Sequence, residues 1–274
     1  MPGTSGHRLI ELLEDAARTL RNVQGAAYDA VGLFNAYLSW ASDQVRMLAP
    51  AVSRGALDEL VTTRRHWALH ALDPATKGRS LAGIVNTEIE QQARLIDAAR
   101  NVLVKELGDY VGVDRILVPD TNVYLHVNAR FDELDWRPVL VAAHRQTRVV
   151  VPLIVLDELD RAKRRSDKVD ADSKESVRTR ARATLKALEE RLLPLERAEP
   201  LDVVTYGLHV ERAGHVRLPD ADSEVIDQAR ALRDLTGLPL AILTGDTGMR
   251  VRAAVSGVET VPVPGQWVVF GATA

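Results

Sequence analysis

Residues 115–120 read RILVPD, a short apolar run that ends in an acidic residue. Four similar runs are predicted to be strands, at residues 148–152, 202–206, 240–244 and 258–263. Segments with helical periodicity lie between them, at residues 136–146, 154–165, 173–192 and 223–235. Short apolar strands that alternate with helices are typical of a parallel sheet with helices on both faces. The second half of the chain is therefore predicted to be an α/β domain.

The first half of the chain has a different pattern, with apolar residues at helical spacing and no strand signal. Helices are predicted at residues 7–25, 26–48, 53–72 and 80–108, and Gly108 is a favourable stop for the last one. The change of pattern places a domain boundary near residue 110. An all-α N-terminal domain, residues 1–110, is thus expected to precede the α/β domain, residues 111–274.

The composition excludes several kinds of site. The 274 residues include no cysteine, which rules out disulfides, thiolate nucleophiles, zinc fingers and iron–sulfur ligation. No apolar run approaches the roughly 20 residues that cross a bilayer, and the N-terminus lacks the features of a signal peptide. We therefore expect a cytoplasmic protein without a membrane partner. Because the net charge is −3, nucleic-acid binding would require a local basic patch.

Four acidic residues are expected at one edge of the sheet. Asp120 directly follows the first strand, Glu158 lies early in the helix after the second, and Asp246 follows the fourth. Asp222 precedes the helix predicted at 223. In an open parallel sheet, ligands bind outside the carboxyl ends of the strands. The order of the elements therefore predicts that these carboxylates converge there.

Two interpretations of these acids compete. Taken singly, Asp222 and Asp246 are more typical of helix N-caps than of ligands. Together, four carboxylates repel one another, and a divalent cation removes that penalty. Oxygen ligands favour Mg²⁺ or Mn²⁺, ions that can assist phosphodiester hydrolysis. Asn122 and Thr244 could then position water or a phosphate oxygen.

Four segments resemble the motifs of PIN-domain nucleases. Residues 118–126 resemble the opening motif, 151–160 the second, 222–229 the third and 243–250 the fourth. The resemblance covers about residues 115 to 263, and it is closest to the PIN domains found beside PhoH-type ATPases. It implies a PIN-like parallel sheet flanked by helices. It also implies a set of catalytic residues, of which the four acids bind Mg²⁺ or Mn²⁺: Asp120, Glu158, Asp222, Asp246, Asn122 and Thr244.

Three acidic residues in or beside the third motif could be its metal-binding residue. Asp220 and Asp227 lie close to Asp222 in the sequence, and the family often has Asn-Asp where this chain has Ala221-Asp222. Asp222 is favoured because it lies seven residues before Ala229, at the expected start of the helix.

A basic stretch follows Glu158, since Lys and Arg outnumber Asp and Glu between residues 160 and 186. Charge pattern alone allows a solvated surface, whereas a position beside a metal site favours contact with phosphate. The residues expected to bind nucleic acid are Arg161, Lys163, Arg164, Arg165, Lys168, Arg178 and Arg182.

The sequence therefore predicts a Mg²⁺- or Mn²⁺-dependent nuclease. The resemblance implies an endoribonuclease that acts on single-stranded RNA and leaves 5′-phosphate and 3′-hydroxyl ends. The alternative is a nucleic-acid-binding or regulatory module on a PIN-like fold with little or no catalysis. The sequence lacks the GxGxxG and P-loop patterns of nucleotide-binding enzymes. The N-terminal helices could serve a homo-oligomer or a protein partner.

Overall fold

A computed structural model describes residues 4–26, 29–74, 80–141, 145–165, 169, 175–193, 204–211 and 215–267. The chain divides into two compact units. The helical unit comprises residues 1–111 with 234–237, and the sheet unit comprises residues 112–233 with 238–274. Among the described residues, no helix is both long enough and apolar enough to cross a membrane.

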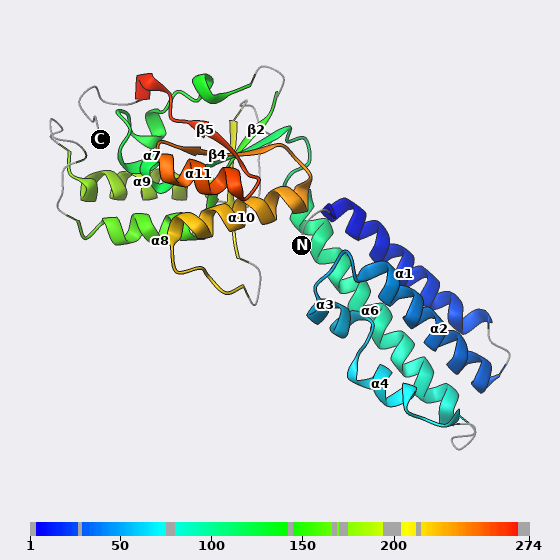
Figure 1. The fold of residues 1–274 in the computed structure, drawn as a ribbon. Coiled ribbons are helices and arrows are strands. Elements are labelled where there is room, and N and C mark those ends of the chain that lie inside the picture. Colours follow the sequence, from blue (N-terminus) through cyan, green and yellow to red (C-terminus); the bar gives the residue numbers. More distant parts are fainter. Residues whose placement is uncertain are drawn as a thin grey trace. The chain divides into compact units, whose positions relative to one another are not determined.

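In its described residues, the helical unit contains three long helices and two short ones (Figure 1). They are α1 (Gly6–Ala26), α2 (Ala30–Leu48), α3 (Arg54–Leu60), α4 (Arg64–His70) and α6 (Ser80–Gly108). The single helix predicted at 53–72 is wrong, because two helices occupy this range. Ser53 caps the first through Ala56 N, and Thr63 caps the second through His66 N. A hydroxyl that satisfies the amides of a new helix start favours a break at that position.

The core of the helical unit lies between α1, α2 and α6, which pack against one another. The apolar stripe predicted for the first helix is buried here, with Leu13 and Leu20 at its centre. Tyr37 and Trp40 fill the space from α2, and Ile96 does so from α6. The described residues of the N-terminal half therefore form an all-α unit, as predicted.

The sheet unit contains a five-stranded parallel sheet in the order β3-β2-β1-β4-β5. The strands are β1 (Arg115–Pro119), β2 (Thr147–Pro152), β3 (Val204–His209), β4 (Leu240–Thr244) and β5 (Glu259–Pro262). Every residue of β1, β2 and β4 is buried, as expected for strands covered on both faces. The predicted α/β class is therefore confirmed.

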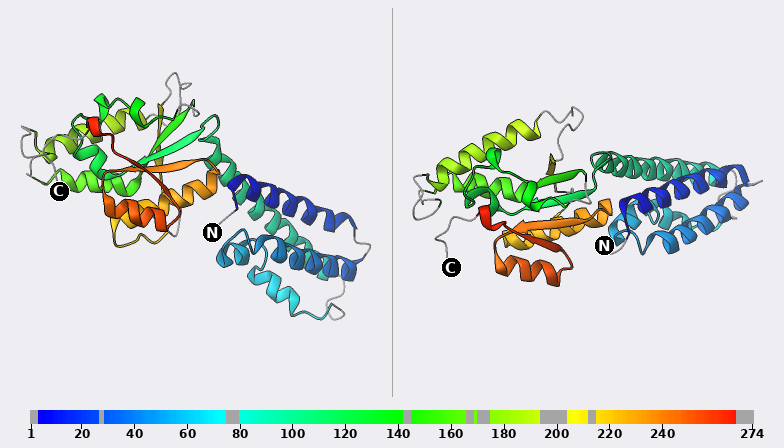
Figure 2. Two further views of the ribbon diagram at one scale, coloured as in Figure 1. Left: turned by 45° about the horizontal axis from the view of Figure 1, so that its top comes forward. Right: turned by 90° about the horizontal axis from the view of Figure 1, so that it is seen from above.

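Helices cover both faces of this sheet. They are α7 (Thr121–Leu125), α8 (Leu153–Ala162), α9 (Val177–Leu192), α10 (Ala221–Thr236) and α11 (Thr247–Val255). In the right view of Figure 2, the orange α11 lies on one face and the yellow-green α9 lies on the other. The strand order places β1 at the centre, beside β4. The residues that follow these two strands are therefore neighbours.

The helix predicted at 136–146 is wrong over the described residues. Only a 3₁₀ turn forms there, Arg137–Val139, and residues 142–144 lie outside the described part. Pro138 lacks the amide that a helix interior needs. Trp136 is buried in an aromatic cluster, with its ring centroid 5.7 Å from that of Trp267 and 6.1 Å from that of Phe131. The packing of the Trp136 ring therefore stabilises this segment, which does not form the predicted α-helix.

Candidate active site at the carboxyl edge of the sheet

Asp120 lies where the central strand β1 ends and α7 begins. Its carboxylate accepts a hydrogen bond from Val123 N at 3.0 Å, so the side chain caps α7. It is nevertheless only 4% exposed. Because capping alone does not require burial, this environment distinguishes Asp120 from an ordinary surface cap.

Thr244 joins this acid to the next strand. The Thr244 hydroxyl, fully buried at the end of β4, donates a hydrogen bond to Asp120 Oδ2. The same hydroxyl accepts a hydrogen bond from Asp246 N at 3.0 Å. Asp246 in turn caps α11 through Met249 N, at 2.8 Å. Thr244 therefore hydrogen-bonds to both Asp120, which follows β1, and Asp246, which follows β4.

Burial raises the pKa of the Asp120 carboxyl from 3.8 to about 6. The hydrogen bonds from Thr244 and from the amides of Val123 and Asn122 lower it, and the negative charge of Asp222 raises it. Asp120 and Asp222 therefore lie close enough to interact electrostatically. A buried carboxylate with an acidic neighbour is a candidate for a site that takes up a cation.

Asp222 lies in the first turn of α10, one residue inside the helix. Burial and the neighbouring carboxylates of Asp220 and Asp246 raise its pKa, whereas Arg252 lowers it. Arg252 Nη2 is 2.5 Å from Asp222 Oδ2, which makes an ion pair between α11 and α10.

The two alternative acids have other environments. Asp220 accepts hydrogen bonds from Ser223 N at 3.0 Å and Ser223 Oγ at 2.7 Å, which lower its pKa. Asp220 therefore acts as the cap of α10. Asp227 is exposed on the helix. These environments favour Asp222 as the acid of the third motif.

Glu158 belongs to the same region through α7. Thr121, the residue after Asp120, donates its hydroxyl hydrogen bond to Glu158 Oε2 at 2.5 Å. Asn122 is exposed in the first turn of α7. The motif residues of α8 and α7 therefore meet beside Asp120.

The chemistry of the donor set fits a hard divalent cation, since it offers carboxylate and hydroxyl oxygens. The buried Asp120 carboxyl, with its raised pKa, is a group that such an ion would stabilise in the charged form. As the side chains stand, however, no three histidine or acidic residues in the described ranges form a group that could hold a metal ion. Glu158 engages Thr121 and Asp222 engages Arg252, so both carboxylates would have to turn to share an ion.

The predicted basic residues lie at the end of α8, in the turn that follows it and on α9, and the two helices pack side by side (Figure 1). Arg161, Arg164, Arg178 and Arg182 are exposed, as is Arg165. Lys163 makes an ion pair with Asp160, which reduces its availability. Lys168 lies outside the described residues. Most of the predicted set is thus placed where a polyanion could reach it.

Sequence reasoning missed two features of this region. Arg252 follows the fourth motif and was not expected at the acids, because its partner is distant in sequence. Glu224 is fully buried and accepts hydrogen bonds from His215 Nε2 at 2.6 Å and Leu218 N at 2.8 Å. These hydrogen bonds hold the segment before α10 in place. The position of Glu224 in the predicted helix gave no indication of them.

Comparison with known proteins gives one family match. A family model described as "PIN domain" matches residues 117–263, more than half of the chain. No curated protein matches with a significant score. A similar solved structure is a domain of a functionally unknown protein from Methanocaldococcus jannaschii DSM 2661, 16% identical with a TM-score of 0.36. The match covers 59% of this chain and 99% of that one.

Proposed function

Because the chain belongs to the PIN domain family, whose members are generally metal-dependent nucleases, we propose that it is a Mg²⁺- or Mn²⁺-dependent endoribonuclease. The observation that carries this proposal is the position of Asp120. It is buried at the end of the central strand, bonded to Thr244 and electrostatically coupled to Asp222. We also propose that it belongs with the PIN domains of PhoH-type proteins, because its four motifs resemble theirs.

In this proposal, Asp120, Glu158, Asp222 and Asp246 would hold the ion. A divalent cation at this position supplies activation of water and stabilisation of charge on the leaving oxygen. Thr244 fixes the orientation of the Asp120 carboxylate, and Asn122 is exposed beside it to meet a phosphate oxygen. The protein's contribution is therefore one fixed carboxylate, Asp120, toward which Glu158 and Asp222 would turn when the ion binds.

The proposed substrate is single-stranded RNA, bound through phosphates by the basic residues at the end of α8, in the turn that follows it and on α9. Exposed arginines on two adjacent helices suit a backbone contact that does not read bases. The site would leave 5′-phosphate and 3′-hydroxyl ends. A cytoplasmic location is part of the same proposal, with which a cysteine-free sequence is compatible.

The experiment is a cleavage assay on panels of single- and double-stranded RNA and DNA, with Mn²⁺, with Mg²⁺ and with chelator. We expect internal, ion-dependent cleavage of single-stranded RNA and 5′-phosphorylated products. Tight RNA binding without cleavage under any condition would instead favour a binding or regulatory module.

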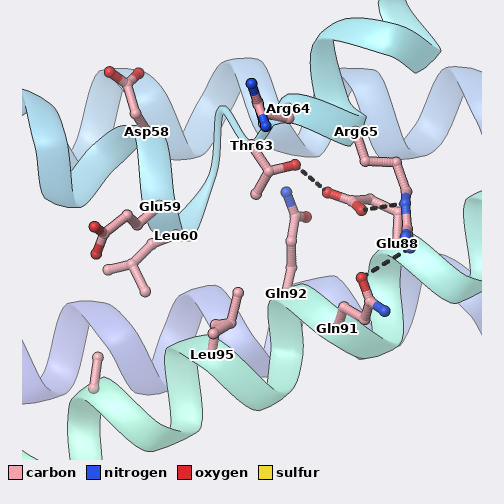
Figure 3. Close-up of a pocket in the computed structure, with 11 residues that line it drawn as sticks. Asp58, Glu59, Leu60, Thr63, Arg64, Arg65, Glu88, Gln91, Gln92 and Leu95 are labelled. Carbon is pink, nitrogen blue, oxygen red and sulfur yellow. Dashed lines mark hydrogen bonds and ion pairs between the residues drawn. The ribbon is translucent and has the colours of Figure 1, made fainter.

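For the helical unit, we propose association with a second copy of the chain. A pocket of about 600 Å³ lies between α6 and the short helices α3 and α4 (Figure 3). Asp58 and Glu59 lie at one end of it and Arg64 and Arg65 at the other, where Glu88 pairs with Arg65 at 3.7 Å. Apolar Leu60, Leu95 and Ala99 are also among the residues lining it.

This charge arrangement is self-complementary. In a two-fold dimer, the acidic end of one copy meets the basic end of the other. Neither Glu59 nor Arg64 has an ion-pair partner among the described residues, and Leu95 is 48% exposed. The pocket therefore offers unpaired charges and apolar surface to a partner of the same sequence.

Charge swaps test the proposed dimer by sedimentation equilibrium. Glu59→Arg and Arg64→Glu should each weaken association, and the double variant should restore it. Arg46→Glu on α2, outside the pocket, is the control. An assembly state that none of these changes alters, or a monomeric wild-type protein, would refute the proposal.

A further inference from the structure

The ion pair between Arg252 and Asp222 lies inside the proposed metal site. Asp222 carries the negative charge that raises the pKa of Asp120, and Asp246 raises the pKa of Asp222 in turn. Arg252 is the cation that opposes these charges at Asp222, at 2.5 Å. The guanidinium therefore neutralises a carboxylate that the proposed function assigns to a divalent ion.

The backbone of α11 brings Arg252 close to a second acid. A Cβ atom built on Gly248 would lie 3.1 Å from Asp246 Oδ1 and 3.4 Å from Arg252 Nη1. Both groups thus approach the same glycine, one turn before Arg252 on the helix. Arg252 is consequently positioned by α11 over the acids at the start of α10 and α11.

The pair is also free to open. The Arg252 side chain is 46% exposed and that of Asp222 is 39% exposed. An ion pair at this exposure contributes about 0.2–1 kcal/mol, so a divalent ion can displace it at small cost. A buried pair would not permit such an exchange.

We propose that Arg252 is an internal counter-ion of the acid cluster, which a divalent cation must displace from Asp222 in order to bind. This inference rests on the proposed function, because it concerns the regulation of the same site. Without the ion, Arg252 stabilises the clustered carboxylates. With the ion, Arg252 is released to the surface. The residue therefore sets the ion concentration at which the site is filled.

Metal binding tests this directly. Mn²⁺ affinity is measured by electron paramagnetic resonance of free Mn²⁺ for the wild-type protein, Arg252→Met, Arg252→Lys and Arg230→Met. Arg230 on α10 is a matched control, since it lines a small pocket together with Arg252 and its substitution removes the same charge, while it makes no ion pair with Asp222 in the described structure. Thermal unfolding with and without Mn²⁺ is the second measurement.

We expect Arg252→Met to bind Mn²⁺ about two- to fivefold more tightly than Arg230→Met, and fivefold corresponds to removal of a competing pair worth about 1 kcal/mol. Arg252→Lys should lie between Arg252→Met and the wild type. The melting temperature of Arg252→Met should be lower than that of the wild type without Mn²⁺ and should rise more when Mn²⁺ is added.

The possible failures are distinguishable. Equal affinities for Arg252→Met and Arg230→Met, in proteins that do bind Mn²⁺, would overturn the counter-ion role and leave the proposed nuclease intact. If neither the wild type nor any variant bound Mn²⁺, the proposed function and this inference would both fail. Binding by Arg252→Met alone would support the inference in its strongest form.

Discussion

Thr244 donates a hydrogen bond to the carboxylate of Asp120 across the two central strands, β1 and β4. The two residues are 124 positions apart in the sequence. Parallel pairing of Pro119 with Leu243 brings them together. The first acid of the site is therefore held in place by the pairing of two neighbouring strands.

Thr244→Val should leave the buried Asp120 carboxylate with backbone partners only. A lost hydrogen bond to a charged group costs about 1.5–3 kcal/mol, so the free energy of unfolding should fall by about that amount in urea denaturation. RNA cleavage should fall at least tenfold as the carboxylate loses its fixed orientation. Thr244→Ser keeps the hydroxyl and should retain most of both properties; a serine variant as impaired as the valine variant would contradict the assigned role.

Asp120→Asn should change the pH dependence of stability in the metal-free protein. The folded pKa of Asp120 is raised from 3.8 to about 6, so its favourable contribution is complete below pH 3.8 and is lost as the pH rises through 6. Asparagine resembles the protonated form at every pH. The variant should therefore gain about 2 kcal/mol over the wild type between pH 4 and pH 8, because each pKa unit corresponds to about 1.4 kcal/mol.

Urea denaturation in the presence of chelator measures this difference. Addition of Mn²⁺ at pH 8 is the control, since it should stabilise the wild-type protein more than the variant. If the difference in free energy of unfolding between the two proteins were the same at pH 4 and pH 8, the pKa of Asp120 would not be raised in the folded protein.

The basic residues at the end of α8, in the turn that follows it and on α9 should determine the salt dependence of RNA binding. Changing Arg161 and Arg164 to alanine, or Arg178 and Arg182, should reduce the slope of log affinity against log salt by about 0.7 per lost phosphate contact. Fluorescence anisotropy with a labelled single strand measures it. Arg46 and Arg94, both exposed on the helical unit, provide a double alanine variant as control. A slope equal to that of the control would mean that α8 and α9 form an ordinary solvated surface.

Gly207→Ala should destabilise the sheet unit. A Cβ atom on Gly207 would lie 2.4 Å from the guanidinium of Arg148, which is itself only 2% exposed between β2 and β3. Overpacking of this kind costs about 1–3 kcal/mol. Gly83→Ala, on the exposed side of α6 with no atom within 4 Å, should instead stabilise the protein by about 0.5–1 kcal/mol. Equal effects of the two substitutions on urea unfolding would refute the close contact at Gly207.

The strands could be predicted because burial on both faces produces continuous apolar runs, as in residues 115–119 and 240–244. The positions of Asp120 and Asp246 follow from those strands. The partners of the acids could not be predicted in the same way. The contacts of Thr121 with Glu158 and of Arg252 with Asp222 depend on how helices pack, and no local pattern records that.

Two secondary-structure errors have local causes that the sequence did contain. Thr63 is a favourable helix cap, and it divides the helix predicted at 53–72. Pro138 opposes the helix predicted at 136–146. In both places the apolar spacing suited a helix, and the specific chemistry of one residue outweighed it.

The central claim is that carboxylates from four separate segments share one divalent ion. Anomalous diffraction from crystals of the full chain grown with Mn²⁺ tests it most directly. We predict an anomalous peak among Asp120, Glu158, Asp222 and Asp246, which is absent from crystals of Asp120→Asn. A well-ordered site without such a peak, or a peak at other residues, would contradict the account.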